Sequence, residues 1–130
     1  MQVTLSALCD FVSETSNRKL NLLGIFKEVT AKGFPSRMAN LYAVVQIDLT
    51  DAETQTGLAF AVRILDPHKK VLMEGGAMKL DKRKPGETGS ITMTIHFQNL
   101  EIGEEGLYTV EFVSNKKVFH ELTFISKKEA

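Results

Sequence analysis

Residues 106–125 read Gly-Leu-Tyr-Thr-Val-Glu-Phe-Val-Ser-Asn-Lys-Lys-Val-Phe-His-Glu-Leu-Thr-Phe-Ile, and this stretch decides the fold class. Successive side chains of a β-strand point to opposite faces, so apolar residues at every second position mark a buried face. Two such runs are present: Tyr108, Val110 and Phe112, then Val118, Leu122 and Phe124. The polar residues between the runs are typical of a turn, and the stretch therefore predicts a β-hairpin.

The length of the loop sets the pairing of the two strands. A three-residue loop, Asn-Lys-Lys, would place Val110 opposite Leu122 and Phe112 opposite His120. A two-residue loop would slip the register by one residue and set Val110 against Glu121. The three-residue loop is therefore expected.

The composition is that of a globular β-protein. A chain of 130 residues is long enough for one domain and short for two, so a single domain over residues 1–130 is expected. The apolar content of 43% argues against disorder. Val, Ile, Thr, Phe and Tyr are plentiful, and these residues suit a pleated, half-buried surface.

Charge and cysteine content limit the partners and the compartment. Lys plus Arg and Asp plus Glu number 16 each, and this balance removes the long-range field of a nucleic-acid binder. The single cysteine, Cys9, cannot form an internal disulfide, and no basic leader precedes an apolar run at the N-terminus. No apolar run approaches the roughly 20 residues that span a bilayer. We therefore expect a cytoplasmic protein with no nucleic-acid partner and no membrane insertion.

Five further stretches alternate between apolar and polar residues and predict strands: residues 3–12, 41–50, 58–64, 71–80 and 91–97. The first of them places its odd-numbered residues on the predicted apolar face: Val3, Leu5, Ala7, Cys9 and Phe11. In the stretch 71–80, Gly75 and Gly76 interrupt the pattern and predict a bulge or sharp bend.

Residues 20–30 fit two interpretations. Leu22, Ile25, Phe26 and Val29 satisfy helical spacing. Interior asparagine and glycine residues disfavour a helix, whereas a glycine inside a strand indicates a bulge or a close backbone approach. The strand interpretation is preferred.

About eight short strands separated by turns predict a two-sheet sandwich or a small barrel. The segment Glu-Glu-Gly-Leu-Tyr that ends at Tyr108 decides between them, because it matches the corner in which a tyrosine hydroxyl bonds back to the preceding backbone. The sequence therefore predicts an all-β, immunoglobulin-like sandwich of two antiparallel sheets.

The first third of the chain resembles a family of small bacterial proteins of unknown function with a β-sandwich body. The resemblance rests on Ala-Leu-Cys-Asp at residues 7–10, Lys-Leu-Asn-Leu-Leu-Gly-Ile-Phe at 19–26, Phe-Pro at 34–35 and Leu-Tyr-Ala-Val-Val at 41–45. Lys27 stands where that pattern has an acidic residue. The resemblance implies a strand at residues 20–30 and a prokaryotic, cytoplasmic context, and it implies no activity.

Two loops are candidates for partner contact. Phe34, Pro35 and Arg37 form a loop with more apolar content than a solvated tip needs, although Phe34 could instead plug one end of the sandwich. A charged loop contributes the second set of candidates: Lys82, Arg83 and Lys84. The charged loop contains no aromatic residue, so it does not fit the pattern of a single-strand nucleic-acid site.

An alternative function is a calcium- or phospholipid-responsive module resembling a C2 domain. It would depend on Asp48, Asp51 and Asp66 meeting in space, because calcium takes six to eight oxygen ligands. The spacing of these aspartates matches no calcium-loop template, so solvated loops are preferred.

No motif commits the chain to catalysis. Cys9 lies on an apolar face and is interpreted as a buried structural thiol, and His120 is interpreted as a satisfied, partly buried imidazole. We therefore expect a non-catalytic binding module without a cofactor. Its expected partner is an unknown protein or a second copy, met through an edge strand or the end loops.

Overall fold

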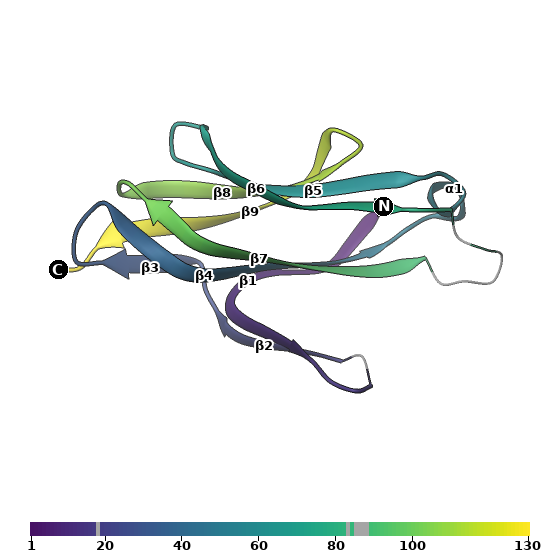
Figure 1. The fold of residues 1–130 in the computed structure, drawn as a ribbon, viewed down its shortest axis with the longest axis horizontal. Coiled ribbons are helices and arrows are strands. Elements are labelled where there is room, and N and C mark those ends of the chain that lie inside the picture. Colours follow the sequence, from purple (N-terminus) through teal and green to yellow (C-terminus); the bar gives the residue numbers. More distant parts are fainter. Residues whose placement is uncertain (18, 83, 85–88) are drawn as a thin grey trace.

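The computed structural model describes residues 1–17, 19–82, 84 and 89–130 (Figure 1). Within these residues the chain forms nine strands and one helical turn: β1 (Gln2–Glu14), β2 (Leu20–Ile25), β3 (Glu28–Ala31), β4 (Ser36–Asp48), α1 (Asp51–Thr54), β5 (Leu58–Leu65), β6 (Val71–Leu80), β7 (Ser90–Ile102), β8 (Gly106–Ser114) and β9 (Lys117–Lys128). In this described part of the chain no helix has the length and apolarity to cross a membrane.

The strands form two sheets that lie face to face as two layers (Figure 1). One sheet has the order β2-β1-β4-β7, and the other has the order β3-β9-β8-β5-β6. The predicted two-sheet sandwich is thus confirmed. One pair departs from the expected antiparallel arrangement, because β3 runs parallel to β9.

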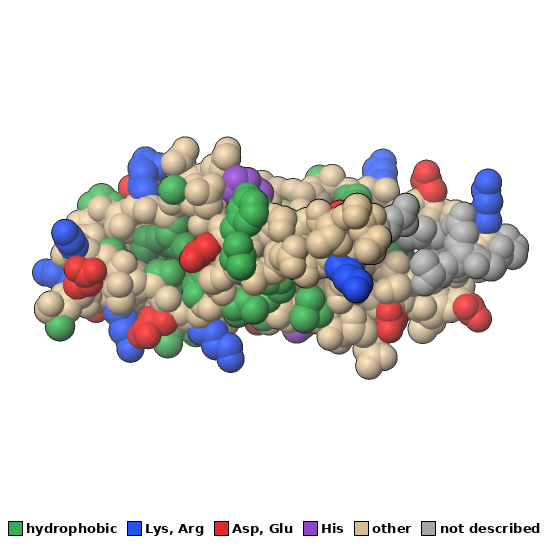
Figure 2. Space-filling model, turned by 90° about the horizontal axis from the view of Figure 1, so that it is seen from below, with side chains coloured by type: hydrophobic (Ala, Val, Ile, Leu, Met, Phe, Trp, Pro, Cys, Tyr) green, Lys and Arg blue, Asp and Glu red, His purple; other side chains and the backbone are tan. Residues whose placement is uncertain are grey.

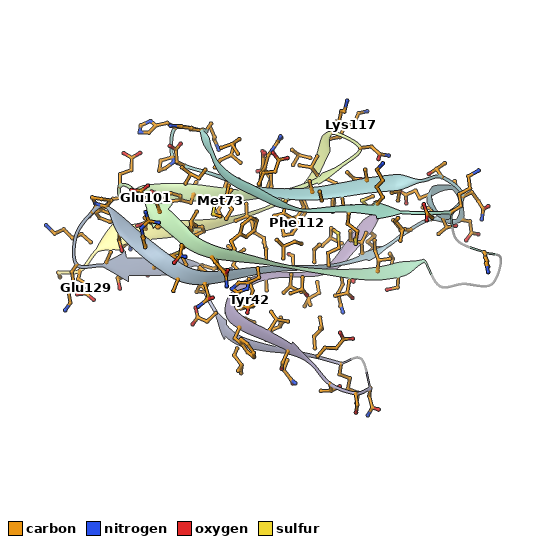
Figure 3. All side chains as sticks on the ribbon, viewed as in Figure 1. Tyr42, Met73, Glu101, Phe112, Lys117 and Glu129 are labelled. Atoms are coloured by element: carbon orange, nitrogen blue, oxygen red, sulfur yellow. The ribbon has the colours of Figure 1, made fainter. Side chains whose placement is uncertain are left out.

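The core lies between the inner faces of the two sheets, where apolar side chains from both layers meet. Its largest fully buried side chains include Tyr108, Phe112 and Phe124 from the predicted hairpin and Leu41 and Ile47 from β4. Phe112 points into the space between the layers (Figure 3). Burial of this surface is the main favourable contribution to folding.

One side of the sandwich is closed by direct contact between the edge strands β6 and β7. Gly75 approaches the Phe97 ring, and a Cβ atom added to Gly76 would overlap Ile95. Gly76 also has a φ of 66° and lies at a register shift of the β5–β6 pair. The bulge predicted from the two glycines is confirmed, and it lets β6 approach β7 closely.

Residues 20–30 are extended, as preferred, but they form two strands in different sheets. β2 pairs with β1, residues 26 and 27 cross the sandwich, and β3 pairs with β9. Gly24 has a φ of 69°, and a Cβ atom there would overlap the Asp10 carboxylate. The crossing explains why the structure has nine strands instead of about eight.

The hairpin has the predicted register but a shorter loop. Val110 lies opposite Leu122 and Phe112 opposite His120, as expected. The loop has two residues, both with positive φ values of 48° and 70°, as in the turns that favour asparagine. A bulge at Phe119 restores the predicted register. Val118 pairs with Val113 and His120 pairs with Phe112, so Phe119 is an extra residue on β9 with no partner on β8.

The bulge changes which residues of β9 face the core. Phe119 packs at 6.0 Å from the Phe60 ring and 6.3 Å from the Phe112 ring, measured between ring centroids. Val118, predicted to face the core, is 40% exposed. That prediction is wrong because strict alternation fails at a bulge.

The predicted apolar face of β1 is also wrong. Leu8 belongs to the core, and it lies opposite the core residue Ala43. Cys9 lies opposite Tyr42, which is outside the core, so the odd-numbered residues from Leu5 onward face away from the second sheet.

Exposed apolar side chains therefore remain on the outer face of the smaller sheet. Phe11 is 48% exposed, Leu23 58% and Ile25 62%. Apolar side chains are visible across the middle of the molecule when it is viewed from this side (Figure 2).

The tyrosine corner is present as predicted. The Tyr108 hydroxyl donates a hydrogen bond of 2.9 Å to the backbone carbonyl oxygen of Glu104. Tyr108 is fully buried, and burial raises the pKa of its hydroxyl. The bond holds the connection between β7 and β8 against the core.

Replacing Tyr108 with phenylalanine is expected to lower the free energy of unfolding by about 1 kcal/mol, because the corner hydrogen bond is lost while the ring remains. Urea denaturation measures this change. Tyr42→Phe is the matched control, since the Tyr42 hydroxyl has no hydrogen-bond partner among the described residues. Equal effects of the two substitutions would show that the corner bond contributes nothing.

Candidate functional site

The predicted Phe34 loop contributes to the core at one end of the sandwich. Phe34 is half-buried and packs against the core, as the plug interpretation expects, whereas Pro35 is exposed. Arg37 is exposed and donates a hydrogen bond from Nη1 to the backbone oxygen of Asn99 at 3.2 Å. The loop lies beside the end of β7 that carries Ile102.

The charged loop lies at the other end of the sandwich. Lys82 and Lys84 are exposed and lie between β6 and β7, near Ser90, whereas Arg83 falls outside the described residues. The two predicted loops are separated by the length of β7, which has 13 residues. They do not form one surface.

The three aspartates of the calcium alternative do not meet. Asp48 and Asp51 lie near Ser90, whereas Asp66 lies in a pocket with Gly103 at the opposite end. Strand geometry puts the two ends roughly 40 Å apart. No group of three or more His, Cys, Asp or Glu that could hold a metal occurs among the described residues. The C2-like arrangement is therefore not formed.

Asp66 has a structural role in its own turn. Its Oδ1 accepts hydrogen bonds from the backbone N–H groups of His68 and Lys70, at 2.8 and 2.9 Å. These bonds close the turn between β5 and β6, as short side-chain-to-backbone bonds of aspartate commonly do.

A groove opens on the side of the sandwich opposite the closed β6–β7 side. It has a volume of about 360 Å³ and lies between residues 6–8 of β1 and residues 121–123 of β9. The last residue of β2, Ile25, and the crossing residues 26 and 27 bound it. We call this feature the β1–β9 groove.

In the described structure, each strand that flanks the groove has a strand partner on its far side, β4 for β1 and β8 for β9, but none on its groove side. β2 pairs with β1 only from Cys9 onward, with one further bond from the Phe26 N–H to the Leu8 carbonyl oxygen at 3.0 Å, and β3 pairs with β9 only from Ile125 onward. The N–H of Ile125 donates to the carbonyl oxygen of Lys27 at 2.9 Å, so odd-numbered residues of β9 direct main-chain groups to this side. Backbone alternation then directs the N–H and C=O groups of Glu121 and Thr123 toward the groove.

A polar contact joins the two sheets beneath the groove. His120 Nε2 lies 2.8 Å from Ser6 Oγ. The imidazole also contacts the Phe112 ring, at 5.8 Å between centroids. This geometry agrees with the interpretation of His120 as a satisfied, partly buried imidazole, and it connects β1 to β9 where neither has a strand partner on the groove side.

His120 makes the stability of the fold dependent on pH. Burial lowers its pKa below the ordinary value of 6.5, and the negative charge of Glu121 opposes this effect. The imidazole recovers its ordinary pKa in the unfolded chain, so below about pH 6.5 the unfolded state binds more protons than the folded state. Stability is therefore lost as the pH falls from about 6.5 toward the folded pKa.

We expect the free energy of unfolding of the wild-type chain to fall between about pH 7.5 and about pH 5.5, with a smaller fall in His120→Gln. Urea denaturation of both proteins at each pH measures the difference. The comparison cancels the other histidines, which both proteins share. An equal pH dependence of the two proteins would contradict the assignment to His120.

The cysteine and the other two histidines lie outside the groove, and each makes contacts that suit a structural role. Burial raises the pKa of the Cys9 thiol, and its side chain is fully buried. His96 Nε2 lies 2.7 Å from Asn40 Oδ1, and its ring stacks on Tyr42 at 4.1 Å. His68 Nε2 lies 2.9 Å from Glu104 Oε1.

Sequence reasoning did not identify the groove. Two signals pointed toward it: the polar His120 on an apolar strand face, and the glycine within residues 20–30 just before the crossing. Neither signal specifies which strand pairs end early, because pairing lengths depend on contacts between distant segments.

Comparison with known proteins identifies a family but no activity. Residues 4–125 match a family described as a family of unknown function (DUF6941). A search of curated proteins found no match. Among solved structures, the chain is similar to the alkylpurine DNA glycosylase AlkC of Pseudomonas fluorescens bound to DNA containing an abasic site analogue. That similarity has 10% identity and a TM-score of 0.46, and it covers 94% of this chain and 30% of the glycosylase chain.

Proposed function

Because the chain belongs to this family of unknown function, whose description assigns no activity, we propose its function from the groove: a non-catalytic module that binds a protein partner along the β1–β9 groove. The single observation that carries this proposal is the groove-side edge of β9 at residues 121–123, which β3 leaves without a strand partner. Exposed edges present rows of free N–H and C=O groups, which another polypeptide can satisfy.

The floor of the groove supports protein binding as well. Leu8, Phe26 and Leu122 line it, and all three belong to the core or pack against it. An apolar floor with main-chain groups along its rim suits a partner that has both apolar side chains and a free backbone.

The end loops are weaker candidates for the partner contact. Phe34 already packs against the core, and the loop that contains Lys82 lies at the opposite end. The groove combines unpaired backbone and apolar surface at one place, so it replaces the end loops as the preferred contact.

The non-catalytic part of the proposal rests on the surroundings of the reactive groups. The Cys9 thiol is fully buried with a raised pKa. His96 and His120 have side-chain partners in Asn40 and Ser6. These contacts suit structural roles for all three side chains.

Site-specific photo-crosslinking tests the proposal. A photoreactive amino acid replaces Thr123 at the groove or, as the matched control, Thr94, which is an exposed threonine on the outer face of the other sheet. In cells of the source organism we expect one discrete protein adduct from position 123 and none from position 94. No adduct at position 123, or the same adducts at both positions, would refute the proposal.

Light scattering of the unmodified chain tests whether the partner is a second copy of the chain or a different protein. An adduct with twice the mass of the chain, together with a dimer in solution, would indicate self-association along the groove. An adduct of different mass from a monomeric chain would indicate a different protein.

A further inference from the structure

We propose that the partner occupies the β1–β9 groove as an extended strand that pairs with β9 at Glu121 and Thr123. The strand places an apolar residue opposite Leu122 and a basic residue opposite Glu121. This inference rests on the proposed function and specifies the chemistry of the partner.

The main-chain groups of β9 require an extended backbone as the partner. The N–H and C=O groups of Glu121 and Thr123 lie on the same side as the Ile125 N–H, which bonds to Lys27. Groups two residues apart along a strand match the spacing of another strand. A polypeptide in the extended conformation can satisfy both residues at once.

β3 already occupies the neighbouring positions on the same edge of β9. It pairs with residues 125–128, and Val29 packs against the core while Glu28 and Thr30 are exposed. Glu28 Oε1 lies 2.5 Å from Lys127 Nζ, so a charge on β3 faces the opposite charge on β9. The incoming strand would continue the β3 ladder in line with it.

The alternation of β9 sets the side chains of the incoming strand. Leu122 packs against the core, so a residue opposite it points into the groove and is apolar. Glu121 and Thr123 are exposed on the other face, the face on which Lys127 contacts Glu28 of β3. A lysine or arginine opposite Glu121 therefore reproduces the charge pair with the signs exchanged.

Two features limit the length of the incoming strand. At one end Lys27 already pairs with Ile125, and at the other end the bulge at Phe119 interrupts the ladder. The site between them accepts about five residues of regular strand. The other exposed edge of this sheet, β6, contains the Gly76 bulge and lies against β7, so it suits an added strand less well.

A synthetic peptide tests the inference. The probe is a fluorescein-labelled octapeptide of alternating lysine and valine, and the comparison probe has glutamate in place of lysine. Fluorescence anisotropy should show tighter binding of the lysine peptide, by about two- to five-fold, because opposite charges face each other across the strands. Hydrogen exchange should show that the lysine peptide protects the amides of Glu121 and Thr123.

Charge reversal locates the binding edge. In Glu121→Lys the preference should change to the glutamate peptide, whereas Glu74→Lys on β6 is the matched control and should keep the preference for lysine. Reversal by Glu74→Lys alone, or by neither substitution, would overturn the inference. Circular dichroism checks that both variants keep the wild-type fold.

Backbone methylation separates strand pairing from attraction between charges. Methylating the peptide amides that face β9 should weaken binding at least about tenfold, because each lost hydrogen bond costs on the order of 1 kcal/mol. Unchanged binding, or no protection of Glu121 and Thr123, would overturn strand pairing while a groove-specific photo-adduct would still support the proposed function. Protection of these amides by self-association of the chain alone would assign the groove to a second copy and also overturn the inference.

Discussion

Replacing Phe112 with alanine is expected to lower the free energy of unfolding by about 3–5 kcal/mol, the usual cost of removing a large aromatic side chain from a packed core. Phe112 is fully buried, lies opposite Val62 and contacts the rings of Phe119 and His120. A domain of this size has a total stability of about 5–15 kcal/mol, so the loss is a large fraction of it. Urea denaturation followed by circular dichroism measures the change.

Val118→Ala is the control for this experiment, because Val118 lies in the same hairpin and is 40% exposed. Its effect should stay within about 0.5 kcal/mol, as for most surface substitutions. A small effect of Phe112→Ala would mean that the hairpin does not pack between the sheets as described.

Replacing Gly76 with alanine should cost roughly 2–5 kcal/mol, for two reasons that act together. The φ of 66° lies in the left-handed region, which an alanine side chain disfavours. The added Cβ atom would also overlap Ile95, a core residue on β7, so the closed side of the sandwich would have to move apart. Thermal and urea denaturation measure the loss.

The matched control is Gly33→Ala. An added Cβ atom at Gly33 meets no atom within 4 Å, so this substitution should change stability by no more than about 0.5 kcal/mol. Similar effects at the two glycines would argue against close packing of β6 on β7.

Much of the fold followed from alternation of apolar residues, and the errors occur where alternation breaks. The hairpin register was predicted, because a slip of one residue would set Val110 against Glu121 instead of Leu122. The predicted loop length was wrong. A two-residue turn followed by a bulge at Phe119 gives the same register as a three-residue loop, and the bulge has no recognisable signature in the sequence. The predicted core-facing side of β1 was wrong, because Cys9 is buried on the outer face of its sheet and not between the two sheets.

The candidate site was much less predictable than the fold. The sequence indicated an edge strand as a possible contact but directed attention to loops around Phe34 and Lys82, which lie at opposite ends. The groove exists because β2 and β3 each cover only part of a longer neighbour. Such partial coverage depends on where residues 26 and 27 cross between the sheets, and local sequence does not encode it.

The position of β9 within its sheet has a consequence for biosynthesis. β9 lies between β3 and β8, so a strand that follows all the other described strands in sequence joins segments that are far apart along the chain. During translation β3 must wait for residues 125–128 to leave the ribosome before it can pair, although the N-terminal part of a nascent chain is free to fold first. The earlier strands of this sheet thus remain an incomplete sheet until β9 has been made, and this is the period in which a chaperone would have most reason to bind them.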